Sequence, residues 1–301
     1  MLFAIYISIL ILSFLCTKAF KTPKKTVFYL SKIIFFVYPC LAFASITSHF
    51  NRQSLIASSH LAWGSFFVLT VGYVFGAVAK RRFFTDSRAQ GTYHFLCAVP
   101  NYIFLPLLLT KSFWGDQAVS RLILTTLGSE AFLWTLGLYA LVSGKPQLKQ
   151  LINPPLLAIL AAVAAIWADI RPLNSLITTL QPIFKLLGQA TIPTSVMILG
   201  ISLGGIKITL RGKKPLWALT LFKLILVPSV TLCLLSTTSL PVLDKKIIFL
   251  ISTMPAAIAT LILTEIFKGD TSLAAEGVFF THIGSIATIP IWLELSELGI
   301  G

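Results

Sequence analysis

Three ionisable side chains stand inside long apolar runs of this sequence: Glu130, Lys223 and His282. A charged side chain near the centre of a bilayer costs on the order of 3 kcal/mol, so residues of this kind are functional candidates. Because histidine titrates near neutral pH and burial makes a carboxyl group easier to protonate, Glu130 and His282 could carry a proton. The structural alternatives are an ion pair between Glu130 and Lys223 that ties two helices together, and a neutral His282 imidazole with satisfied hydrogen bonds.

Two prolines predict helices that break within their apolar runs. The segments AVPNYIFLPLLL (98–109) and STMPAAIATLIL (252–263) carry Pro100 and Pro255 near the middle of their runs. Proline disfavours helical geometry in the residue before it and suits the first turn of a new helix. We expect two half-helices in each run, with free N–H groups at the start of the second half: Tyr102, Ile103, Ala256 and Ala257. A simple proline kink with rearranged hydrogen bonds is the alternative.

The residues around these two breaks predict an anion site. Free N–H groups at a helix N-terminus carry partial positive charge, and the side-chain amide of Asn101 can donate a hydrogen bond to a carboxylate. Asparagine is also a common helix cap, which gives Asn101 a purely structural alternative. The expected substrate-binding residues are Pro100, Asn101, Tyr102, Thr253, Pro255 and Ala256.

Motifs for other chemistry are missing from the sequence. It holds neither a phosphate-binding GxxxxGK[ST] loop nor an HExxH zinc motif, and no apolar run bears several acids. The four cysteines lie inside apolar runs without paired spacing, which is typical of small buried side chains. We therefore expect no enzymatic activity, no cofactor, no catalytic residues and no metal site.

The elements that position these residues must be membrane helices. Of the 301 residues, 56% are hydrophobic and only 11% are charged, whereas soluble domains carry about 25% charged residues. Apolar runs recur from end to end, each long enough to cross a hydrocarbon layer of ~30 Å. The net charge of +14 comes mainly from Lys and Arg between these runs, which indicates membrane orientation rather than nucleic-acid binding. The chain is expected to be a multi-pass protein of the cell (plasma or inner) membrane, in contact with lipid.

We predict about ten transmembrane helices, at roughly 2–17, 27–49, 60–79, 91–111, 119–142, 152–168, 184–204, 215–236, 245–266 and 272–294. The odd-numbered connections hold fifteen Lys and Arg residues, and the even-numbered connections hold five. Because short cytoplasmic loops carry the excess of positive charge, this asymmetry places both termini outside the cell.

The spacing of prolines indicates an internal repeat. Pro39 and Pro193 are 154 residues apart, and Pro100 and Pro255 are 155 apart. This offset places helices one to five on helices six to ten, and an odd number of helices per half inverts the second half in the membrane. Inverted repeats with broken helices are typical of secondary transporters, although two matching proline pairs could also be coincidence.

Five segments together resemble a known family. They are VPNYIFLPLLL (99–109), Asn153-Pro154-Pro155, GQATIPTSVMILGISL (188–203), Lys223-Leu224 with Pro228, and the pair of helices over 254–292 with its Gly269-Asp270 turn. In this order they resemble the auxin efflux carrier family, which includes plant auxin carriers and bacterial permeases for malate or malonate. The resemblance covers nearly the whole chain.

The resemblance implies an all-α membrane fold of ten helices, a 5+5 inverted repeat in which broken helices four and nine cross. Residues 1–143 form the first repeat, 144–151 a short cytoplasmic connection and 152–301 the second repeat. Helices 1, 2, 6 and 7 would form a scaffold, and helices 3–5 and 8–10 a mobile transport domain. A homodimer through the scaffold helices is left open.

The same resemblance implies that anionic organic substrates bind where the two broken helices cross. Asn101 matches the asparagine that contacts the substrate carboxylate in the plant carriers, and Pro100 and Pro255 match the crossover prolines. Two departures speak against auxin itself as the substrate: the central connection is short, and Ala256 stands where the plant carriers tend to have a polar residue.

The leading expectation is a secondary transporter that moves small organic anions, such as carboxylates, by an alternating-access, elevator-like mechanism. Coupling to protons through Glu130, His282 or Lys223 is one option. A sodium-coupled symporter of the bile-acid type is the alternative, because hydroxyl and amide oxygens near the crossing could bind sodium: Thr191, Thr194, Ser252, Thr253 and Gln189. Sodium dependence of uptake separates these two. A non-transporting membrane receptor or enzyme would bind a ligand without counterflow, and the repeat argues against it.

Overall fold

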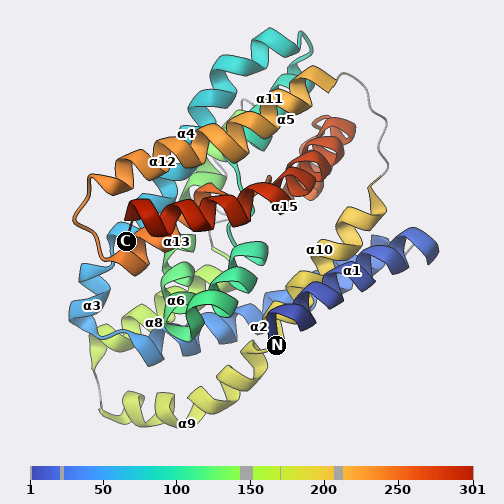
Figure 1. Cartoon of the computed structure of the whole chain (residues 1–301). Coiled ribbons are helices and arrows are strands. Elements are labelled where there is room, and N and C mark those ends of the chain that lie inside the picture. The colour runs from blue at the N-terminus through green and yellow to red at the C-terminus, as the bar shows by residue number, and fades with distance from the viewer. Residues whose placement is uncertain (1, 21–23, 143–151, 170, 207–212, 301) are drawn as a thin grey trace. The chain divides into compact units, whose positions relative to one another are not determined.

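The computed structural model describes residues 2–20, 24–142, 152–169, 171–206 and 213–300, and within these residues the chain is built from helices (Figure 1). Among the described residues, six helical stretches are long and apolar enough to cross a membrane: Lys25–His49, Arg52–Phe83, Phe104–Val142, Ser175–Gly205, Lys214–Ser236 and Thr271–Glu297. Two shorter apolar helices, Ala4–Phe20 and Pro154–Ala168, accompany them. The connection expected over 144–151 lies outside the described residues.

The first half of the chain contains α1 (Leu2–Phe20), α2 (Lys24–His49), α3 (Arg52–Ala57), α4 (His60–Phe83), α5 (Ser87–Ala98), α6 (Phe104–Phe132), the π-helical turn η1 (Leu133–Gly137) and α7 (Leu138–Val142). The second half contains α8 (Pro154–Ala168), α9 (Arg171–Gly188), α10 (Thr191–Gly205), α11 (Lys213–Leu221), the π-helical turn η3 (Phe222–Leu226), α12 (Val227–Ser236), α13 (Val242–Ser252), α14 (Ala259–Ile266) and α15 (Thr271–Ile300).

Polar caps set where several of these helices begin. The Asn153 side chain accepts a hydrogen bond from Leu156 N (2.9 Å), directly before the two prolines that open α8. Asp86 accepts from Ala89 N (3.0 Å) at the start of α5. Caps of this kind satisfy N–H groups that have no partner inside their own helix, so they fix the first turn.

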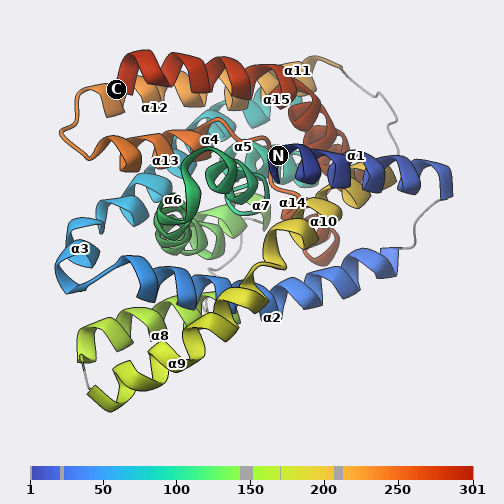
Figure 2. The ribbon, with the colours of Figure 1, turned by 60° about the horizontal axis from the view of Figure 1, so that its bottom comes forward.

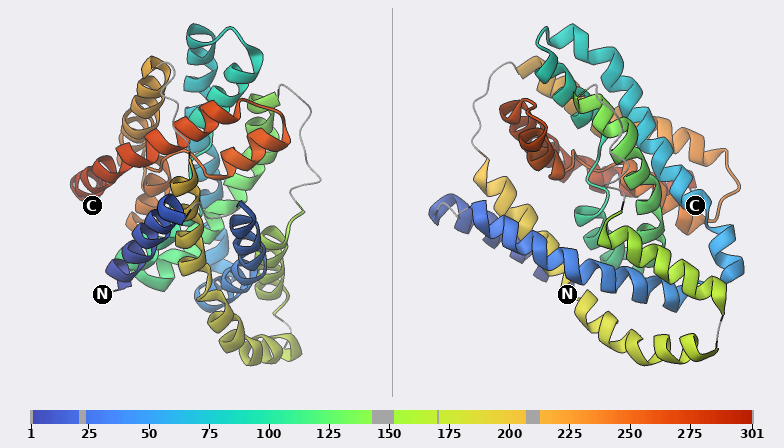
Figure 3. Two further views of the ribbon diagram at one scale, coloured as in Figure 1. Left: turned by 90° about the vertical axis from the view of Figure 1, so that its right-hand side faces the viewer. Right: turned by 180° about the vertical axis from the view of Figure 1, so that it is seen from behind.

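The chain divides into two compact units. The first comprises Met1–Leu61, Leu107–Leu127 and Lys149–Gly205, and the second comprises Ala62–Pro106, Gly128–Leu148 and Ile206–Gly301. In the first unit, α2 contacts both α8 and α9 (Figure 2), and α1 lies beside α10 (Figure 3). Gly200 and Gly204 permit this last contact, because a Cβ atom at these positions would lie 2.5 Å from Leu10 O and 2.8 Å from Phe14 O. Small residues four apart favour such close packing of membrane helices.

In the second unit, the long helix α15 contacts α5, α11, α12, α13 and α14. The interior between these helices is filled by fully buried aromatic and aliphatic side chains, including Tyr93, Phe95, Leu96 and Phe249. The last eight residues of α5, from Gly91 to Ala98, are all buried, and so is the break residue Val99 that follows them. The segment that leads into the first break is therefore held in the core of its own unit.

One boundary differs from the sequence prediction, and one expected interruption is shorter than a loop. The seventh span was expected to begin at residue 184, but α9 already begins at Arg171 and the apolar stretch at Ser175. Polar residues along α9, such as Thr178 and Gln181, conceal this start in the sequence. The interruption expected near residues 112–118 is present as a sharp break: Gly115 has a non-helical backbone, with a φ of 75° that favours glycine, and it divides α6 into two helical segments.

Candidate functional site

The helix pairs α5/α6 and α13/α14 are each interrupted at a proline, as predicted. Residues 99–103 separate α5 from α6, and residues 253–258 separate α13 from α14. The two interruptions lie against each other as a short antiparallel bridge that pairs Pro100 with Ala256. Asn101 N donates to Pro255 O (2.8 Å), and Ala257 N donates to Val99 O (3.1 Å). Because the donors are Asn101 and Ala257, the missing N–H groups of both prolines leave the bridge intact.

This bridge corrects part of the sequence expectation. The N–H groups of Ala256 and Ala257 were expected to be free, but Ala257 bonds across the bridge and Ala256 N donates to the Thr281 hydroxyl (3.1 Å). The helix after the second break begins only at Ala259. The N–H groups of Ala256 and Ala257 therefore bind atoms of the protein and are not available to a ligand.

Asn101 has one half of its side-chain amide in use. Its Oδ1 accepts a hydrogen bond from Phe104 N (3.1 Å), the first residue of α6, so the asparagine caps this helix from two residues before Ile103, the N-cap residue, whose own side chain makes no cap bond. Its Nδ2 group is buried and has no partner among the described residues, and the side chain is 3% exposed. A buried donor without a partner costs about 1–3 kcal/mol, so Nδ2 marks a place where a hydrogen-bond acceptor would be stabilised.

Tyr102 and Glu130 form a polar cluster beside Asn101. The Tyr102 hydroxyl donates to Glu130 Oε1 (2.9 Å), and Trp134 Nε1 donates to Glu130 Oε2 (2.7 Å). The ion pair between Glu130 and Lys223, considered as a structural alternative, is not formed among the described residues, because Lys223 donates to Cys97 O instead (2.9 Å). The carboxyl group of Glu130 is therefore tied to the segment that carries Asn101.

Thr253 and His282, two further residues singled out from the sequence, make their side-chain hydrogen bonds to carbonyl groups of their own helices. The Thr253 hydroxyl donates to Leu250 O (2.8 Å) in its own helix, so its hydrogen is turned back onto α13. His282 Nδ1 lies 2.8 Å from Val278 O, which identifies it as the protonated nitrogen, and Nε2 has no partner among the described residues. His282 follows Thr281, the residue that holds the second break at Ala256.

A second buried histidine was missed by the sequence analysis. His94 is 1% exposed and lies between Lys80 Nζ, 3.0 Å from Nδ1, and Tyr73 O, 2.9 Å from Nε2. It stands six residues before Pro100 in the same apolar run. The rule that singled out Glu130 and His282 would have found it.

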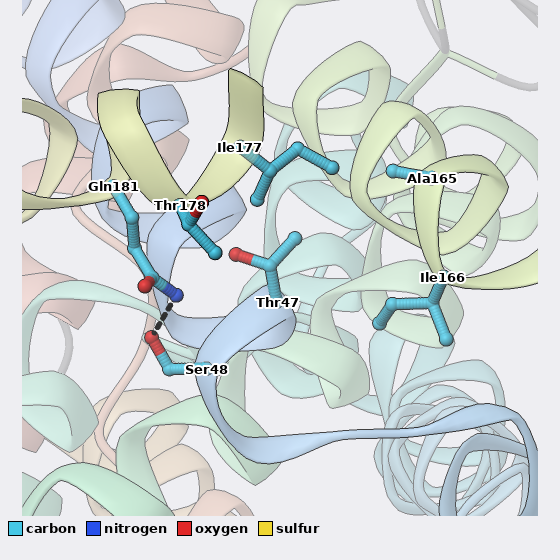
Figure 4. Close-up of a pocket in the computed structure, with 7 residues that line it drawn as sticks. All are labelled: Thr47, Ser48, Ala165, Ile166, Ile177, Thr178 and Gln181. Atoms are coloured by element: carbon cyan, nitrogen blue, oxygen red, sulfur yellow. Dashed lines mark hydrogen bonds between the residues drawn. The ribbon is translucent and has the colours of Figure 1, made fainter. Parts of the chain in front are cut away.

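The first unit contains a surface cavity of about 360 Å³ (Figure 4). Neutral polar side chains from α2 and α9 meet there, and Gln181 Nε2 donates to Ser48 Oγ (2.7 Å) across the gap. None of the predicted site residues lines it. The hydrogen bond joins two helices of that unit.

Comparison with known proteins identifies the family. The description "Membrane transport protein" matches residues 1–293, almost the whole chain. The chain belongs to this family. An uncharacterized transporter of Methanocaldococcus jannaschii is 24% identical over 269 residues, covering 86% of each chain. The uncharacterized transporter YfdV of Shigella flexneri is 23% identical over 282 residues, covering 88% of this chain and 87% of the relative. Membership of this membrane transport family, the auxin efflux carrier-like family, agrees with the several apolar helices of a multi-pass membrane protein.

Proposed function

We propose that this chain is a secondary transporter of small organic anions, with carboxylates as the substrate class. The observation that carries the proposal is the buried, unpartnered Nδ2 group of Asn101 at the bridge between two interrupted helices. The cap bond from Phe104 N to Oδ1 fixes the amide plane, so the orientation of Nδ2 is set before a ligand arrives. The positive end of the α6 dipole lies at the same place and favours an anion.

The strength of this site follows from its donors. A hydrogen bond to a charged acceptor contributes about 1.5–3 kcal/mol, and a helix N-terminus contributes typically 0.3–1 kcal/mol. Nδ2 is inaccessible in the present conformation, so the substrate must reach it through a conformational change.

The proposal includes a ten-helix inverted repeat with elevator-like movement of the transport helices. Support comes from the matching breaks, since α5 ends at Ala98 and α13 at Ser252, which are 154 residues apart. The first compact unit contains the four expected scaffold helices, and it also includes Leu107–Leu127 from the expected transport helices. The orientation can be tested with single cysteines introduced into a variant that lacks the native cysteines. In intact cells, an impermeant thiol reagent should label a cysteine at the N-terminus of the protein and should not label a cysteine that replaces Arg82. Labelling at Arg82 from outside would refute the inverted orientation.

Glu130 and His282 are the proposed proton-coupling groups of this transporter. Glu130 is linked through Tyr102 to the Asn101 segment, and His282 follows the residue that holds Ala256. Protonation of Glu130 would change its contact with Tyr102 at the first break, and protonation of His282 would place a positive charge next to Thr281, which binds Ala256 at the second break. The sodium-coupled alternative requires a cation site with oxygen ligands at the same place.

A thermal-shift screen tests the substrate class. Purified protein is melted with a panel of carboxylates that includes malonate, malate, succinate, acetate and indole-3-acetate, with matched amines and neutral amides as controls. At least one carboxylate should raise the melting temperature in a concentration-dependent way, because a ligand that binds only the folded state stabilises it by mass action. Stabilisation by amines alone would contradict an anion site.

A further inference from the structure

The break after α5 leaves backbone carbonyl groups that a continuous helix would pair. In an α-helix each C=O accepts a hydrogen bond from the N–H four residues later. Pro100 has no N–H for Leu96 O, and Asn101 N donates to Pro255 O rather than to Cys97 O. The C-terminal end of a helix carries partial negative charge. The last turn of α5 is therefore a place that favours a cation.

The ammonium group of Lys223 lies at this place. Its Nζ atom donates to Cys97 O at 2.9 Å, and the side chain is only 3% exposed. Within the part of the chain that the structure describes, it forms no ion pair with a carboxylate. Because a buried ammonium is costly without a compensating partner, the negative end of α5 must supply that compensation.

Both the lysine and the carbonyl group are held in position. Lys223 lies in the π-helical turn η3, an irregularity that is frequent at functional sites, and Trp292 Nε1 caps the carbonyl of the next residue, Leu224 (2.6 Å). On the other side α4 approaches closely, since a Cβ atom at Gly72 would lie 2.4 Å from Cys97 O. The contact between Lys223 and the end of α5 is thus built into the second unit.

In transporters with broken helices, half-helix C-termini and unwound carbonyl groups commonly coordinate the coupling sodium ion or proton. We infer that the ammonium group of Lys223 fills this cation position as a permanent part of the protein, so that the anion is bound and moved without sodium. A sodium ion at Cys97 O would meet the ammonium at short range, and the two like charges would repel. The inference rests on the proposed function, and it selects against the sodium-coupled alternative.

The test needs no identified substrate. Wild-type protein is melted in sodium chloride and in choline chloride of equal ionic strength, and the two melting temperatures should agree. Lys223→Ala should melt several degrees lower in choline chloride, and sodium chloride should restore part of the loss by occupying the vacated position. Lys223→Arg keeps the charge and should stay indifferent to sodium. Lys185→Ala, which removes an exposed lysine of α9, is the matched control and should melt like wild type in both salts.

Any of three results would overturn the inference. The wild-type protein could melt at a higher temperature in sodium chloride than in choline chloride, or Lys223→Ala could melt at the wild-type temperature in choline chloride. Alternatively, no concentration of sodium chloride could raise the melting temperature of Lys223→Ala. If Lys223→Ala does not accumulate, the sodium response of the wild type and of Lys223→Arg decides. These outcomes are independent of carboxylate binding. A carboxylate screen without any hit, together with a sodium-indifferent wild type, would refute only the proposed function.

Discussion

Replacing Asn101 by Asp should abolish carboxylate binding while the protein remains folded. Aspartate has the shape of asparagine and keeps an oxygen that can accept from Phe104 N, so the cap of α6 survives. It replaces the unpartnered Nδ2 donor by a second acceptor and adds a negative charge that repels the substrate. We expect the loss of affinity to exceed that of Asn101→Ala, which should weaken binding roughly ten- to a hundred-fold because one charged hydrogen bond is lost.

The two variants together separate binding from capping. Asn101→Ala removes both the cap bond and the donor, and a lost cap costs only about 1 kcal/mol, so this variant should stay folded with a melting temperature slightly below that of the wild type. Affinity is measured by titrating the carboxylate that gives the largest thermal shift with the wild type. Wild-type affinity in Asn101→Ala would show that Asn101 is only a helix cap and that the site lies elsewhere.

Glu130→Gln should uncouple transport from the proton gradient. Glutamine keeps the size of the side chain and can still accept from Tyr102 or Trp134, but it cannot exchange a proton. In proteoliposomes, accumulation of the carboxylate driven by a pH gradient should disappear, whereas exchange of internal for external substrate should persist. The exposed carboxyl group of Glu265 provides a matched control, because Glu265→Gln should keep the full pH response.

His282 requires the same experiment, since the structure does not place it in contact with Glu130. If His282 carries the proton instead, His282→Ala should lose gradient-driven accumulation and Glu130→Gln should retain it. Proton coupling through this pair is wrong if both variants keep the wild-type response, or if wild-type uptake ignores the gradient.

The two helix breaks could be predicted from the sequence because proline acts locally. Pro100 and Pro255 restrict the residues beside them and lack an N–H group, and these effects do not depend on the rest of the fold. The helices do end at Ala98 and Ser252. The two possible roles of Asn101 could also be predicted, because a side-chain amide offers both an oxygen that can cap a helix and an N–H group that can donate to an anion.

The partners of the site residues could not be predicted, because they come from distant segments. Nothing near Ala256 in the sequence indicates that Thr281 takes its N–H group, and nothing near Lys223 indicates Cys97 O. Opposite charges in apolar runs suggested a pair between Glu130 and Lys223, but each found neutral partners. A single sequence shows which polar groups need partners, and only the tertiary structure shows which partners they find.

Counterflow of a carboxylate tests the central claim most directly. Proteoliposomes are loaded with the unlabelled carboxylate that stabilises the protein best, and uptake of the labelled compound is followed in sodium-free choline buffer. Wild-type protein should accumulate label transiently above equilibrium, and Asn101→Asp should behave like protein-free liposomes. If the wild type binds the carboxylate but shows no uptake above protein-free liposomes, the chain is not an organic-anion transporter and the account is contradicted.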